Sequence, residues 1–90
     1  MDRPRAETLA LKALAFLAGD GETLNRFLAL SGLHLEDLRE RADDPFLLGA
    51  VLDFMLGDDK LLSPFAESEG LDPKNVHAAR RALPGAAPET

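Results

Sequence analysis

The sequence predicts an all-α protein, and three observations support this prediction. Residues that favour strands are scarce, because the chain contains no Ile, Tyr or Trp and very few Val and Thr. Leu and Ala, which lose little side-chain entropy in a helix, supply most of the apolar content instead. The apolar residues also recur at helical spacing between stretches punctuated by Gly and Pro.

Length and composition predict a single domain. The chain has 90 residues, of which 46% are hydrophobic, and this suffices for one compact core but not for two. A charged fraction of 29% without a long polar tract is typical of an ordered protein. We therefore expect one helical domain over residues 1–83, followed by a disordered tail at residues 84–90.

Helix start and stop signals divide the chain into six segments. Asp44-Pro45 and Asp72-Pro73 each place an N-cap residue before a first-turn proline. Glycines such as Gly32 and Gly70 follow the apolar runs and are expected to end their helices in the left-handed conformation. The expected helices span about residues 5–18, 21–31, 35–42, 45–56, 59–69 and 73–83.

An internal repeat appears when the sequence is shifted by 38 residues. The shift superimposes Leu9, Leu14, Phe16, Gly19, Asp20, Leu24, Phe27, Gly32 and Leu33 on Leu47, Leu52, Phe54, Gly57, Asp58, Leu62, Phe65, Gly70 and Leu71. Leucine matches are common in such a chain, but matched Gly-Asp junctions and Phe residues are not. We therefore predict a compact six-helix bundle built from two similar three-helix units, at about residues 5–42 and 45–83, that share one core.

The segment from Phe46 to Leu56 is the most hydrophobic part of the chain. Apart from Gly49 and Asp53 every residue in it is apolar, which is typical of a helix buried on most sides. We favour a central core helix. The alternative is that surplus leucines reach the surface as a docking or dimer stripe. That stripe would consist of Leu48, Leu52 and Leu56.

The sequence offers little for catalysis. The absence of Cys excludes disulfides, thiolate catalysis and Cys-ligated metal sites. His34 and His77 belong to no metal-binding motif, and no serine lies in a nucleophile motif. We therefore expect no enzymatic activity, no cofactor and no metal site.

One motif suggests a different function. The segments at residues 59–69 and 73–83 resemble a helix-turn-helix, although Glu69 occupies a position that is usually apolar. The matching positions are Phe65, Ala66, Gly70, Leu71 and Val76. A DNA-reading second helix would present Lys74, His77 and Arg81 on its outward side and would place Arg80 near a phosphate. Basic residues near a helix C-terminus are also favoured by the helix dipole alone, so we rank DNA binding second.

Charge and hydropathy bear on partners and location. The net charge of −6 repels nucleic acid and anionic membranes at long range. No stretch approaches the roughly 20 apolar residues that cross a bilayer, and no secretion signal is visible. We expect a cytoplasmic protein, monomeric or weakly homodimeric, whose partner is another protein rather than nucleic acid or a membrane.

A family resemblance agrees with these expectations. It is carried by the segments LALKALAFLAGDGETLNRFLALSGL, DLRERADDPFLLGAVLDFMLGDDKLL and FAESEGLDPKNVHAARRAL, about Thr8 to Leu83. These resemble a family of short uncharacterised proteins, mainly alphaproteobacterial, the domain of unknown function 3572. The resemblance implies a small helical cytosolic protein and assigns no catalytic residue. Our functional hypothesis is a helical protein-interaction or scaffold module without catalytic activity.

Overall fold

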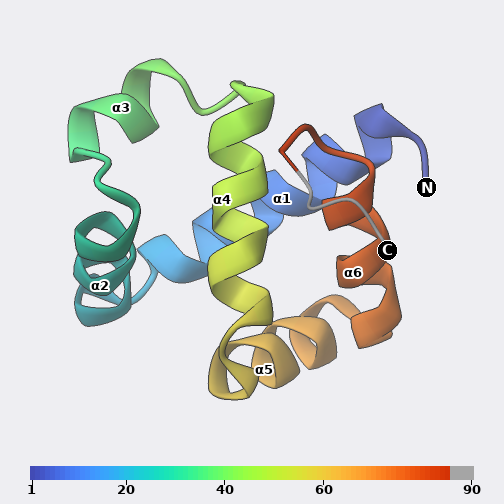
Figure 1. The fold of residues 1–90 in the computed structure, drawn as a ribbon. Coiled ribbons are helices and arrows are strands. Elements are labelled where there is room, and N and C mark those ends of the chain that lie inside the picture. The colour runs from blue at the N-terminus through green and yellow to red at the C-terminus, as the bar shows by residue number, and fades with distance from the viewer. Residues whose placement is uncertain (86–90) are drawn as a thin grey trace.

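Six α-helices form the fold, and no strand occurs among residues 1–85, the part of the chain that the computed structural model describes (Figure 1). The prediction of an all-α protein with six helices is therefore confirmed. The helices are α1 (Arg3–Ala18), α2 (Gly21–Ser31), α3 (Leu35–Glu40), α4 (Pro45–Leu56), α5 (Asp59–Glu69) and α6 (Pro73–Arg81).

Aspartates begin five of the six helices by accepting a backbone N–H that the first turn leaves unpaired. They are Asp2, Asp20, Asp44, Asp58 and Asp72. The Thr23 hydroxyl and the Glu22 N–H both donate hydrogen bonds to the Asp20 carboxylate. These bonds hold the pKa of Asp20 below its ordinary value, and the bond from Thr23 has the larger effect. The cap at Asp2 also places the start of α1 two residues before the predicted one, because its carboxylate accepts the Arg5 N–H at 2.9 Å.

Helix ends follow the glycines closely. Gly32 and Gly70 have φ of 76° and 65°, so both are left-handed as predicted. Gly19 and Gly57, which the repeat pairs, both end their helices in the right-handed region. The structure differs from the prediction at α3, which ends at Glu40 because Arg41 leaves helical geometry.

The chain after α6 also differs from the prediction. The helix ends at Arg81 rather than near residue 83, because the Arg80 side chain donates to the carbonyls of Leu83 and Pro84 and draws the chain into a turn. The disordered tail predicted for residues 84–90 stays a prediction, although the carbonyl of its first residue, Pro84, accepts from Arg80 at 3.1 Å. Residues 86–90 of the predicted tail lie outside the described residues.

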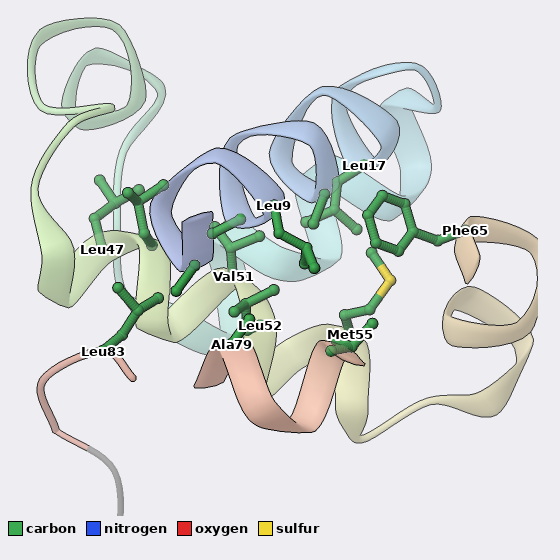
Figure 2. Packing of buried hydrophobic residues seen from close by; sticks show 14 of the residues in the cluster. Leu9, Leu17, Leu47, Val51, Leu52, Met55, Phe65, Ala79 and Leu83 are labelled. Carbon is green, nitrogen blue, oxygen red and sulfur yellow. The ribbon is translucent and has the colours of Figure 1, made fainter. Parts of the chain in front are cut away.

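Helix α4 lies at the centre of the fold. It packs against α1, α2, α5 and α6, and in Figure 1 it crosses α1 with α2 and α3 on one side and α5 and α6 on the other. Figure 2 labels core residues of α4 (Leu47, Val51, Leu52 and Met55) together with core residues from other parts of the chain (Leu9, Leu17, Phe65, Ala79 and Leu83). On the buried face of α1, the small side chains of Ala6, Ala10 and Ala13 let the neighbouring helices approach closely.

Two aromatic pairs join the halves of the chain in a reciprocal way. Phe16 meets Phe65 edge to face with ring centroids 5.5 Å apart, and Phe54 meets Phe27 in the same manner at 5.3 Å. Under the 38-residue shift Phe16 corresponds to Phe54 and Phe27 corresponds to Phe65. The Phe16–Phe65 contact is therefore the counterpart of the Phe54–Phe27 contact. The halves are not equivalent everywhere, since α6 packs on both α1 and α4 whereas the six-residue α3 has no comparable packing. The superposition of two units stays a prediction.

Phe27 and Phe65 are each 1% exposed, and this generates a stability prediction. Replacing either with Ala should lower the free energy of unfolding by about 3–5 kcal/mol, because each substitution leaves a cavity in the core. Urea unfolding followed by circular dichroism measures the loss. Phe46→Ala is the control, since this ring is 67% exposed and its removal should cost within about 0.5 kcal/mol. Equal, small losses in all three variants would contradict the core assignment.

Candidate functional site

The leucine stripe considered in the sequence does not form a surface. Leu48 and Leu52 are completely buried, and Leu56 is partly buried against the core. The docking hypothesis is therefore wrong for Leu48 and Leu52. The reason is that neighbouring helices cover α4 on several sides, and these leucines fill the contacts. The preferred interpretation, a central core helix, is the one that the structure shows.

The basic residues of α6 separate into two groups. Lys74, His77 and Arg81 are exposed, whereas Arg80 is only 9% exposed. The α5–α6 corner has the expected arrangement, with Phe65 and Val76 buried and a left-handed glycine at the turn. The proposed phosphate contact by Arg80 is wrong, because this side chain is directed into the protein.

Arg80 instead connects three parts of the chain. Its Nε and Nη2 donate to both carboxylate oxygens of Asp53 in α4, at 2.6 and 3.1 Å. Its Nη1 donates to the carbonyls of Leu83 at 3.3 Å and Pro84 at 3.1 Å. Such a two-pronged Arg–carboxylate pair fixes the relative orientation of the elements that carry it. We call this arrangement the Arg80 clamp.

Gly49 provides the space for the Arg80 clamp. A Cβ at this position would lie 3.1 Å from Arg80 Nη1 and 3.3 Å from the Pro84 carbonyl oxygen. Glycine in the middle of a helix is unfavourable, so its presence here is explained by the close approach of the guanidinium. The role of Gly49 in making room for Arg80 was not predicted from the sequence. The available signal was a glycine and an aspartate one turn apart in an otherwise apolar helix.

A surface groove lies between α2 and α4, and we call it the α2–α4 groove. It encloses about 530 Å³. Its lining residues are Arg26, Phe27, Leu30, Ser31, Ala50, Asp53, Phe54, Gly57 and Asp58. Leu30 leaves 73% of its surface exposed, the largest exposure among the large apolar side chains of residues 1–85. Sequence analysis did not single out this residue, because an isolated leucine on an amphipathic helix carries no distinguishing signal.

Charged groups border this apolar surface. Arg26 Nη2 lies 2.8 Å from Asp58 Oδ2, and its guanidinium carbon lies 5.4 Å from the centre of the Phe54 ring. Asp58 Oδ1 meanwhile accepts the Lys60 N–H and so caps α5. The Asp53 side chain stays 60% exposed despite its pairing with Arg80. The groove therefore combines an apolar wall with two carboxylates at its edge.

Two kinds of feature are absent from residues 1–85, a candidate metal cluster and a membrane-spanning helix. Across residues 1–85 no group of three or more His, Asp or Glu side chains could hold a metal ion. In the same part of the chain, no helix is long and apolar enough to span a membrane. Fold and site thus define a small six-helix protein with an open groove, at whose edge Asp53 pairs with Arg80 and Asp58 pairs with Arg26.

One family model matches most of the chain. The model of the family described as protein of unknown function (DUF3572) matches residues 3–86, and the chain belongs to this family. The resemblance seen in the sequence is thereby confirmed. The chain has no significant match among curated proteins or among solved structures.

The Arg80 clamp generates a prediction about Gly49. Gly49→Ala should lower the free energy of unfolding by about 1–3 kcal/mol, because the added methyl group displaces the guanidinium or the Pro84 carbonyl. Gly21→Ala is the matched control, since nothing lies within 4 Å of a Cβ there and the change should be neutral or favourable by up to about 1 kcal/mol. Thermal and urea unfolding measure both. A stabilising Gly49→Ala would show that the clamp does not need the glycine.

Proposed function

We propose that this protein is a helical protein-interaction module that binds an amphipathic helix of a partner protein in the α2–α4 groove. The occupant is a helix whose apolar face carries a Lys or Arg at its border. The observation that carries this proposal is the exposure of Leu30 beside the Phe54 ring in the groove. We further expect a cytoplasmic protein that is monomeric or weakly homodimeric.

The shape and apolar lining of the groove support this occupant. Partner helices commonly lay an apolar face into a groove between two helices. Covering an exposed leucine of this kind is favourable by on the order of 1–2 kcal/mol, so Leu30 can act as an anchor. The partly exposed Phe54 ring supplies the aromatic wall, and it packs edge to face on Phe27, which is only 1% exposed.

Charge supports a basic rather than an acidic partner. The chain carries a net charge of −6, which raises the encounter rate with cationic surfaces. Within the groove, the Asp53 carboxylate is held in place by Arg80 but stays exposed to solvent, so its oxygens can accept further hydrogen bonds. A Lys or Arg of the partner can therefore donate to Asp53 without rearranging the groove.

The same groove gives no support to a catalytic function. Neither histidine is among its lining residues, so no imidazole base stands there. Ser31 is the hydroxyl that lines it, and its Oγ already pairs with the backbone of Leu28 and Leu33. We therefore propose binding without catalysis.

DNA binding by α6 remains the alternative function. The α5–α6 corner favours it, and Lys74, His77 and Arg81 lie on the exposed side of α6. The engagement of Arg80 with Asp53 narrows the basic surface to fewer residues than a typical DNA-binding face presents. The overall negative charge opposes the interaction further.

A defined helical peptide tests the proposed function. The probe is a synthetic peptide of Leu and Lys with its leucines along one face, titrated into isotope-labelled protein. NMR chemical shifts should change in a saturable way at Phe27, Leu30, Ala50 and Phe54. Leu30→Gln should weaken binding about tenfold, because it removes an apolar anchor without changing the charge. Leu11→Gln is the control, since Leu11 is an exposed leucine of α1 outside the groove and its replacement should leave the affinity unchanged.

Two further probes separate the alternatives. A peptide with the same leucine face and Glu in place of Lys should bind more weakly, because it opposes Asp53 and the net charge. Binding of the Leu/Lys peptide that is unaffected by Leu30→Gln would overturn the proposal, since charge alone would explain it. Salt-sensitive binding of duplex DNA that Lys74→Ala abolishes would establish the alternative.

A further inference from the structure

We propose that the protein has a second site for the same class of occupant, between α1 and α5, and that Lys12 blocks it in the unbound chain. This inference rests on the proposed function, because it takes the occupant to be an apolar helix with a basic residue. The site is a smaller groove of about 310 Å³. We call it the α1–α5 groove, lined by Lys12, Ala15, Phe16, Phe65, Ser68 and Glu69.

Under the 38-residue shift every lining residue of the α1–α5 groove has a counterpart in the α2–α4 groove, whereas Arg26, Gly57 and Asp58 of the larger groove have none in the smaller one. Lys12, Ala15 and Phe16 of the first half correspond to Ala50, Asp53 and Phe54 of the second half. Phe65, Ser68 and Glu69 of the second half correspond to Phe27, Leu30 and Ser31 of the first half. Each of these counterparts lines the α2–α4 groove. The repeat was recognised from sequence identity, whereas the grooves are features of the surface. Their agreement is therefore an independent sign that the surfaces are equivalent.

The aromatic walls of the two grooves have the same construction. In the α1–α5 groove the Phe16 and Phe65 rings meet at 65°, and in the α2–α4 groove the Phe27 and Phe54 rings meet at 66°. Each wall takes one ring from the first half of the chain and one from the second. In each wall one ring is partly exposed, Phe16 or Phe54, and the ring behind it, Phe65 or Phe27, is only 1% exposed.

The two grooves differ in the position of their ion pairs, since the α2–α4 groove is bordered by Arg26–Asp58 and the α1–α5 groove by Lys12–Glu69. Lys12 Nζ lies 3.9 Å from Glu69 Oε1, and so joins the two helices that border the groove. The positions equivalent to Lys12 and Glu69 hold Ala50 and Ser31, whose side chains are too short to bridge the α2–α4 groove. Lys12 thus places its ammonium group on Glu69, where a basic residue of a partner would bind.

The blocking pair is weak enough to be displaced. The Lys12 side chain is 59% exposed and that of Glu69 is 30% exposed, so water screens their attraction. A cation of the partner can replace Lys12 on Glu69 while the apolar face of the partner covers Ala15 and the exposed part of the Phe16 ring. Ser68 stands where the other groove has Leu30, so the second site should bind more weakly than the first.

Two charge variants test the second site with the same Leu/Lys peptide. Lys12→Ala should strengthen binding at the α1–α5 groove by about two- to fivefold, because the internal competitor is removed. Glu69→Gln should weaken it by a similar factor, because the carboxylate that receives the cation is lost. The readout is the chemical shifts of Ala15, Phe16 and Ser68, which are separate from those of the α2–α4 groove.

Matched controls exclude a general effect of charge. Lys74→Ala on α6 and Glu67→Gln on α5 change the net charge equally but line neither groove, so both should leave the affinity at residues 15, 16 and 68 unchanged. Saturable chemical-shift changes could occur only at residues of the α2–α4 groove, in the wild-type protein and in the Lys12→Ala variant alike. This result would overturn the proposal of a second site and leave the proposed function standing. Shifts at neither groove would overturn both.

Discussion

The Arg80 clamp is the interaction on which the arrangement of the second half of the chain depends. A buried guanidinium is tolerated only when its donors are paired, and here Asp53 and two backbone carbonyls accept from it. The clamp holds α6 on α4 and turns the chain after α6 so that Leu83 enters the core. It also positions the Asp53 carboxylate at the edge of the α2–α4 groove. One side chain thus links the stability of the fold to the geometry of the candidate site.

The grooves arise from how unevenly the helices cover α4. Helices α1 and α6 pack closely on it, and α1 presents small alanines that allow this approach. Helix α2 buries completely only Phe27, so the flank of α4 that carries Ala50 and Phe54 stays partly uncovered. The α2–α4 groove is therefore the place where the packing of a small all-helical core is left incomplete.

An internal duplication would explain why two surfaces of this kind occur. Reciprocal aromatic pairs join the halves, and the same Asp and Gly signals bound α2 and α5. Small differences at matched positions can then give the surfaces different affinities. A lysine that reaches a glutamate narrows one groove, whereas alanine and serine leave the other open.

Much of the local structure follows from the sequence alone. Asp-Pro pairs and glycines fix helix ends through hydrogen bonds and φ preferences that act within a few residues, and the continuous apolar run predicts that α4 is buried. The role of Arg80 required the tertiary structure, because its partner Asp53 lies 27 residues away and helix-dipole reasoning explains a terminal arginine equally well. The grooves required it too. Composition states how much apolar surface the chain has, but only the packing of helices decides which part of that surface remains uncovered.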